Sequence, residues 1–204
     1  MKALKRAKAQ WPEPRYFVGS PDFIHAIGVL SASYNLLELR LRQFLELYTL
    51  MPHPGGTQVF ISSNNQERLN LLRMCVGKSA HPLRIRNCVF RFADGYDACT
   101  QNRNILMHSE TVPIIKSDGR QEVAFKKLSK KPPFTPNLFS PSIKELRKIA
   151  DATDKFQRFG YELLVHALQN FEAPKLVEDA FLSLNGFPPF ALPRKPSLPK
   201  ILSP

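Results

Sequence analysis

The sequence predicts a mainly α-helical fold: an antiparallel bundle of about four helices, with a β-hairpin between the third and the last long helix. Two observations lead to this fold class. Apolar residues recur at steps of three and four over three long stretches, and helix-starting residues precede these stretches. The bundle is expected over residues 20–172, with helices near 20–51, 65–77, 80–109 and 141–172 and a hairpin at 111–128.

Both ends of the chain are expected to lie outside the bundle. Residues 1–19 carry five basic residues and one acidic residue, and Trp11-Pro12-Glu13-Pro14 prevents a helix from continuing inward. These residues predict a flexible basic arm. Residues 173–204 are rich in proline and predict an extended tail that cannot build a core of its own. Two alternatives stay open for the tail: a disordered end, or a docking arm for a partner subunit.

The net charge of +12 is not confined to the ends of the 204-residue chain. The expected bundle, residues 20–172, holds 20 basic and 14 acidic residues, so half of the excess positive charge belongs to the folded body. A basic body attracts polyanions, because phosphate contacts release counterions. RNA is therefore an expected partner. The alternative is that the charge only keeps the surface soluble.

The sequence also predicts a cytoplasmic protein without a membrane partner. No apolar run approaches the ~20 residues that a membrane span needs. The charged N-terminus lacks the apolar segment of a secretory signal. The three cysteines, Cys75, Cys88 and Cys99, are odd in number and form no Cys-x-x-Cys pair, which points to a reducing interior.

The first long helix is expected to begin at Ser20-Pro21-Asp22, which combines a capping hydroxyl, a proline at the first helical position and an acid in the first turn. Its bundle seam follows at helical spacing: Ile27, Leu30, Tyr34, Leu37, Leu41, Phe44 and Tyr48. Further leucines at positions 36, 39, 45 and 47 widen the apolar surface beyond one bundle side. This excess predicts a two-fold homodimer.

Local signals also place the remaining elements. The segment Ser63–Glu67 opens the shorter helix, and Gly77 is expected to stop it. Asp118-Gly119 supplies the turn chemistry of the hairpin. Ser140-Pro141 repeats the device of Ser20-Pro21 and is expected to start the last helix.

The third long helix carries an arginine on its apolar stripe. The stripe consists of Ile85, Val89, Phe92, Tyr96 and Cys99. Continued at the same spacing, it reaches Arg103 and then Leu106. A cation at such a position needs compensation, either from an acid in the bundle or from an anion at an interface. Glu38, beside the seam of the first helix, is the candidate acid.

The same helix ends in Arg-Asn-x-x-x-His, which is Arg103, Asn104 and His108. Asn104 and His108 share a helix face, and Asp97 and Gln101 extend that polar face backwards as supporting residues. Metal-free RNA cleavage needs a base, an acid and a cation for the charge that develops on the phosphate. Histidine can transfer either proton, and arginine offers a planar fork that matches phosphate oxygens. Asparagine can bind a phosphate oxygen or hold the imidazole in one tautomer.

Motif and layout together resemble the HEPN superfamily, whose members carry an Arg-x(4–6)-His motif late in a bundle helix, often with asparagine directly after the arginine. The resemblance covers about residues 20–172. It implies a metal-independent endoribonuclease of toxin or defence type, in which the motifs of two protomers face each other in a homodimer. Arg103, Asn104 and His108 match the motif position by position. An antitoxin or another protein partner is also implied.

Two further interpretations stay open. HEPN proteins include non-catalytic members, so the alternative function is a dimeric binding or scaffold module for nucleic acid or a protein. Arg103 could also be a structural residue paired with Glu38, with His108 merely favoured by the helix dipole. No cofactor is expected, because Gly55-Gly56 lacks the rest of a phosphate loop. No metal site is expected either, because the other histidines show no metal-ligand spacing.

Overall fold

A computed structural model describes residues 20–51, 53–115, 117–118, 121–128, 135–169 and 191–202. In this part of the chain the element order is α2 (Pro21–Thr49), α3 (Gly55–Ser62), α4 (Asn65–Lys78), α5 (Leu83–Met107), β1 (Glu110–Ile115), β2 (Gln121–Leu128), β3 (Pro136–Phe139) and α6 (Ile143–Gln169). The protein is therefore mainly helical, as predicted, with one small antiparallel sheet. The predicted N-terminal arm lies outside the described residues.

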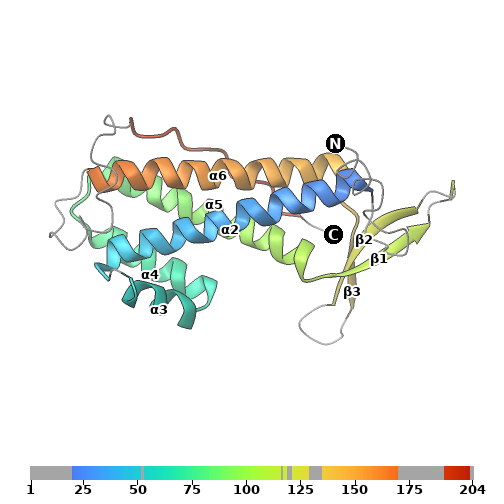
Figure 1. Ribbon diagram of the computed structural model, residues 1–204, viewed down its shortest axis with the longest axis horizontal. Coiled ribbons are helices and arrows are strands. Elements are labelled where there is room, and N and C mark those ends of the chain that lie inside the picture. The colour runs from blue at the N-terminus through green and yellow to red at the C-terminus, as the bar shows by residue number, and fades with distance from the viewer. Residues whose placement is uncertain are drawn as a thin grey trace, which may run out of the picture.

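Three long helices, α2, α5 and α6, lie along the longest axis of the molecule (Figure 1). α2 and α6 run away from the sheet, and α5 returns towards it. The α3–α4 pair lies beside the end of α2 that is far from the sheet. In the described ranges, no helix combines the length and apolar character required to cross a membrane.

The capping signals confirm the starts of two helices and correct two other boundaries. The Ser20 hydroxyl accepts from the Phe23 N–H, and Asn64 caps α4 in a reciprocal box with Glu67. The predicted stop at Gly77 is wrong, because α4 continues to Lys78. The predicted start at Ser140-Pro141 is also wrong. Ser142 makes the cap instead: its hydroxyl accepts from the Glu145 N–H, and Glu145 accepts from the Ser142 N–H in return.

Helix α3 was not predicted, because glycine commonly ends a helix and Gly55-Gly56 lies at its start. Gly56 instead allows a close approach: a Cβ atom at this position would collide with Glu46 and with the backbone of Met51. The absence of a side chain therefore lets α3 pack directly against the end of α2.

The β-hairpin is confirmed, and a third strand extends it. β1 pairs with β2 from Glu110 opposite Lys126 to Ile115 opposite Gln121. β3 then pairs with the other edge of β2, with Phe139 opposite Phe125. The strand β3 was not predicted. Pro136 is compatible with a strand here because it is the first residue of an edge strand.

The core has two parts that meet along α2 and α5. The larger part fills the bundle and contains most of the predicted seams, including Tyr34 and Tyr96. The close approach of α5 and α6 depends on Gly95, where a Cβ would collide with the Phe156 ring. The smaller part lies against the sheet and contains Leu30, Leu106, Phe125, Phe139 and Leu146. The C-terminal end of α5 is thus held between two cores.

The four additional leucines of α2 were expected to form an apolar surface for a second protomer, and two of them do not. Leu45 and Leu47 are buried inside this chain, so they offer nothing to a partner. Leu39 is half-buried, and of the four leucines only Leu36, with 42% of its surface exposed, is open to a partner. The homodimer itself stays a prediction.

We expect the bundle to lose stability as the pH falls below about 6.5, the ordinary pKa of histidine. His81 is buried against Tyr48, and its Nε2 lies 3.2 Å from the carbonyl oxygen of Ala167. Burial lowers its pKa, and the nearby His166 lowers it further. The unfolded chain therefore binds this proton more readily than the folded chain. The stabilisation is complete above the unfolded pKa and is lost as the pH falls through the folded pKa.

The measurement is urea unfolding at about pH 7.5 and about pH 5.5, on either side of that pKa. A His81→Gln variant keeps an N–H donor for Ala167 and cannot titrate, so its stability should change less between the two pH values. An equal acid-induced loss in both proteins would assign the effect to other groups.

Candidate functional site

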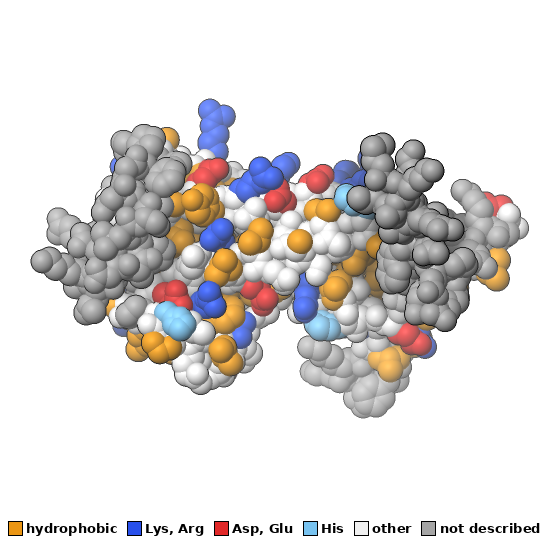
Figure 2. Space-filling model, viewed as in Figure 1, with side chains coloured by type: hydrophobic (Ala, Val, Ile, Leu, Met, Phe, Trp, Pro, Cys, Tyr) orange, Lys and Arg blue, Asp and Glu red, His pale blue; other side chains and the backbone are white. Residues whose placement is uncertain are grey.

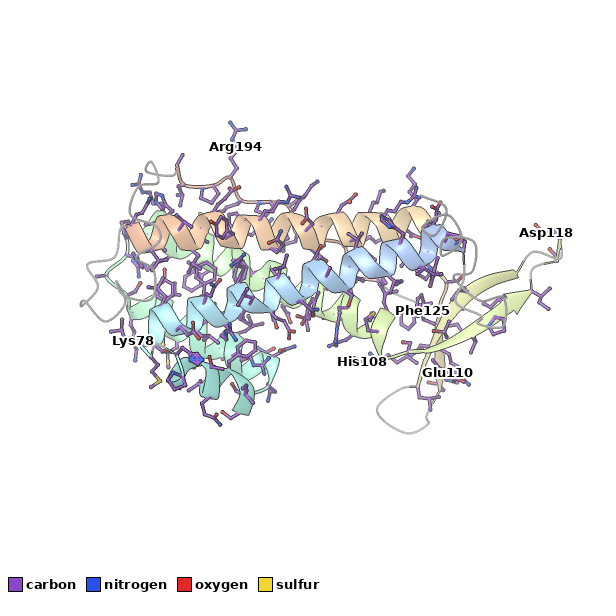
Figure 3. All side chains as sticks on the ribbon, viewed as in Figure 1. Lys78, His108, Glu110, Asp118, Phe125 and Arg194 are labelled. Carbon is purple, nitrogen blue, oxygen red and sulfur yellow. The ribbon has the colours of Figure 1, made fainter. Side chains whose placement is uncertain are left out.

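The predicted motif lies where the bundle meets the sheet. α5 ends at Met107, and the N–H of His108 closes its last turn on the Asn104 carbonyl at 3.3 Å. The chain then enters β1 at Glu110. In Figure 2 the lower outline is indented between the α3–α4 pair and the sheet, with a basic side chain and an imidazole at this place. Figure 3 places His108 there, at the tip of α5.

Arg103 and His108 are in direct contact, with 2.6 Å between Arg103 Nη1 and His108 Nε2. A guanidinium has donors and no acceptor, so His108 Nε2 must accept this hydrogen bond. A neutral imidazole that accepts at Nε2 carries its proton on Nδ1. The contact therefore joins a permanent cation to a basic lone pair five residues further along the chain.

Arg103 is compensated by an aromatic ring and not by an acid. Its guanidinium carbon lies 5.3 Å from the centre of the Tyr34 ring on α2. No ion pair joins Arg103 to Glu38 in the described part of the chain, so the suggested pairing with that acid is not seen. The side chain is half-buried, which leaves its outer edge in contact with solvent.

Asn104 contacts the arginine and not the imidazole. Its Oδ1 accepts from Arg103 Nη1 at 3.2 Å, so the arginine, and not the asparagine, holds His108. Both polar contacts of Arg103 use Nη1. The edge formed by Nε and Nη2 has no hydrogen-bond partner among the described residues. An edge with two such donors can bind an oxyanion through two parallel hydrogen bonds.

The two supporting residues on α5 are not brought into the site. Gln101 donates to Asp97 at 3.1 Å, one helical turn behind the motif. Gln101 is exposed, and neither residue contacts Arg103 or His108. Glu38 acts at a distance. The pKa of Tyr34 is raised mainly by burial, and the negative charge of Glu38 raises it further.

A buried hydroxyl network behind the motif was missed. Thr100 donates to the Tyr96 carbonyl at 2.8 Å and lies 3.0 Å from the Tyr34 hydroxyl. Tyr96 in turn donates to Asn65 of α4 at 3.2 Å. Burial raises the pKa of both tyrosines, so their hydroxyls keep their protons and serve as donors. The network ties α2, α4 and α5 together one turn below Arg103 and holds Tyr34 under the guanidinium.

Asn102 was also missed, although its spacing gave a signal. It lies four residues before Leu106 and therefore falls on the buried face, and its exposed fraction is 0%. Its side-chain amide is used at both ends. Nδ2 donates to the Lys200 carbonyl at 3.0 Å, and Oδ1 accepts from the Leu202 N–H at 2.8 Å. The partner is the described part of the tail, residues 191–202, which packs on the body of its own chain.

The comparisons with known proteins name no relative: no protein-family model, no curated protein and no solved structure matches this chain. Within the described ranges, no three histidine, cysteine or acidic side chains gather as metal ligands. The function must therefore be argued from the geometry and chemistry of the site itself.

We expect Arg103→Ala to lower the free energy of unfolding by less than about 1 kcal/mol, because the variant loses a half-exposed cation–π contact and uncovers no buried acid. Asn102→Ala should cost more, about 1–3 kcal/mol, because it leaves a carbonyl and an N–H of the tail without their partner. Thermal and urea unfolding of both variants make the comparison. An Arg103→Ala variant at least as unstable as Asn102→Ala would show that Arg103 is a structural residue.

Proposed function

We propose that this chain is a metal-independent endoribonuclease of the HEPN type that acts as a homodimer. The observation that carries the proposal is the pair formed by Arg103 and His108. A permanent cation touches an imidazole lone pair, and no acid neutralises the cation in the described part of the chain. A phosphate diester is the substrate class that needs both groups at one place. The basic body supports a polyanionic substrate.

The proposed chemistry assigns one task to each residue of the motif. Arg103 binds the scissile phosphate through its free Nε–Nη2 edge and stabilises the negative charge that develops there. When Arg103 turns to the bound phosphate it releases Nε2 of His108, and this freed lone pair takes the proton of the 2′-hydroxyl as this oxygen attacks phosphorus. The bond from phosphorus to the 5′-oxygen breaks, which leaves a 2′,3′-cyclic phosphate and a 5′-hydroxyl. Asn104 accepts from Arg103 and keeps its own N–H groups for a phosphate oxygen.

The leaving 5′-oxygen needs a proton, and the protonated imidazole of His108 of the partner subunit would supply it. Each chain contributes one motif, and His108 is exposed at the molecular surface. Met107 beside it is also 39% exposed, an apolar side chain of the kind that interfaces bury. These features support a homodimer with two motifs facing one groove. A toxin or defence role and an antitoxin partner rest on the resemblance alone and stay predictions.

The test is incubation of the purified full-length chain with mixed RNA in EDTA, followed by analysis of the product ends. We expect cleavage with 2′,3′-cyclic phosphate termini. His108→Ala should lower the rate by about 10²–10⁴-fold, the usual contribution of one positioned acid–base group. Arg103→Lys should also cleave more slowly, because a point charge cannot reproduce the bidentate fork. His25→Ala, which removes an exposed histidine of α2, is the matched control and should cleave normally.

Wild-type protein that binds RNA without cleaving it would replace this proposal with the alternative, a non-catalytic binding or scaffold module. Cleavage that persists undiminished in His108→Ala would contradict the assignment of the site. If the wild type sediments as a monomer at micromolar concentration, no second protomer is present to protonate the leaving oxygen. That result would contradict the two-protomer mechanism.

A further inference from the structure

The described part of the C-terminal tail has a burial pattern of its own. In residues 191–202 the partly buried side chains recur at every third position, at Pro193, Pro196, Pro199 and Leu202. Only Leu192 adds to this series, and the other side chains of the segment are exposed. A β-strand would bury every second residue. A polyproline II helix has three residues per turn, so one edge of it buries every third residue.

The spacing of the contacts agrees with this conformation. Arg91 Nε donates to the Pro196 carbonyl at 2.9 Å, and Asn102 binds the backbone on both sides of Ile201. The eleven steps along the chain from Arg91 to Asn102 span about 16 Å in α5, at about 1.5 Å per residue. The five steps from Pro196 to Ile201 span about the same length in a polyproline II helix, at about 3.1 Å per residue. The segment therefore runs alongside α5 between these two contacts.

Asn102 binds this segment as a second peptide group would. Its amide pairs with the Lys200 carbonyl and the Leu202 N–H, the two backbone groups that flank Ile201 on one side. The Asn102 amide binds backbone groups of an extended segment, so this contact does not depend on the side chain of Ile201. Asn102 is fully buried with the segment in place, and both ends of its amide are bound to the segment.

The same residue is adjacent to the candidate site in the chain. Asn102 immediately precedes Arg103, in the last two turns of α5. Leu202 and Ile105 each pack against the smaller core, which contains Leu106 of the same turns. The segment therefore contacts the end of α5 through the amide of Asn102, and the smaller core through an apolar side chain. These contacts restrict how far the turn that carries the motif can fray.

The contact is incomplete on the side of α6. A cavity of about 320 Å³ remains between residues 199–202 and α6, lined there by Glu145, Lys148, Ile149 and Ala152. The segment is thus attached at defined points and is not packed tightly along its whole length.

We propose that residues 191–202 form a polyproline-type strap, and that its binding to Asn102 holds Arg103 and His108 in the mutual contact from which the reaction starts. Asn102 is then a positioning residue that acts through its neighbours. The expected effect of the strap on catalysis rests on the proposed function. Its effect on the geometry of the Arg103–His108 pair is independent of that function.

Three substitutions in the full-length chain separate the hydrogen bond from the packing without changing α5. Leu202→Pro removes the N–H that donates to Asn102. Leu202→Ala keeps that N–H and removes most of the side chain. Ile201→Pro places the same ring one residue earlier, where the side chain is exposed and the N–H does not bind Asn102. Circular dichroism during heating confirms that each variant keeps the bundle.

Three readouts are needed: amide hydrogen exchange over residues 98–108, the ring signals of His108 in NMR spectra, and the kcat and KM of RNA cleavage. In Leu202→Pro we expect exchange at the end of α5 to rise by about tenfold or more, as for local opening. The His108 signals should shift, and kcat should fall by about 10–100-fold, the effect of a misplaced group, with KM nearly unchanged. Ile201→Pro should resemble the wild type, and Leu202→Ala should lie much closer to it than Leu202→Pro.

Unchanged exchange and unchanged His108 signals in Leu202→Pro would overturn the proposal. So would equal effects in all three variants, because these would reflect packing or proline in general. A wild type that does not cleave RNA would refute the proposed function alone, since exchange and the His108 signals still decide whether the strap positions the pair. A Leu202→Pro variant with faster exchange but normal His108 signals and normal kcat would reduce the strap to a structural element.

Discussion

The burial of α5 between α2, α4 and α6 is the constraint on which the rest of the structure depends. The helix buries an apolar stripe from Ile85 to Leu106, and Gly95 lets it approach the Phe156 ring of α6 directly. This packing fixes α5 in rotation and in height. Its last turns must then present Arg103 beside the Tyr34 ring, where a further apolar residue would otherwise have continued the stripe. The polar site is thus a consequence of how the apolar part of the same helix packs.

The long helices and the hairpin could be predicted because their signals are local. Capping groups lie within four residues of the positions they stabilise, and a seam repeats within one helix. The elements that were not predicted are those whose local sequence pattern is determined by tertiary contacts. Gly56 resembled a helix terminator, but it permits the contact of α3 with α2. The strand β3 contains a proline, and only pairing with Phe125 and its neighbours on β2 makes it a strand.

The motif residues could be predicted from their spacing, and their partners could not. Arg103, Asn104 and His108 lie within six residues, so helix geometry alone brought them together. The contacts of Tyr34 with Arg103 and of Asn102 with Leu202 join positions far apart in the sequence, the latter 100 residues apart. Contacts between residues so far apart in the chain produce no repeating pattern in the sequence from which they could be predicted. For the tail, composition predicted an extended chain but not the surface to which it binds.

The arrangement of the site depends on the hydrogen bond that Arg103 Nη1 donates to Nε2 of His108. Long-range ¹H–¹⁵N NMR spectra of the imidazole, recorded at about pH 8.5 where an ordinary histidine is neutral, show which ring nitrogen carries the proton. In the wild type we predict a proton on Nδ1 and a bare, accepting Nε2. In Arg103→Ala the ring should lose this preference and move towards the Nε2–H form. A wild-type His108 that already carries its proton on Nε2 would contradict the contact and the arrangement of the site built on it.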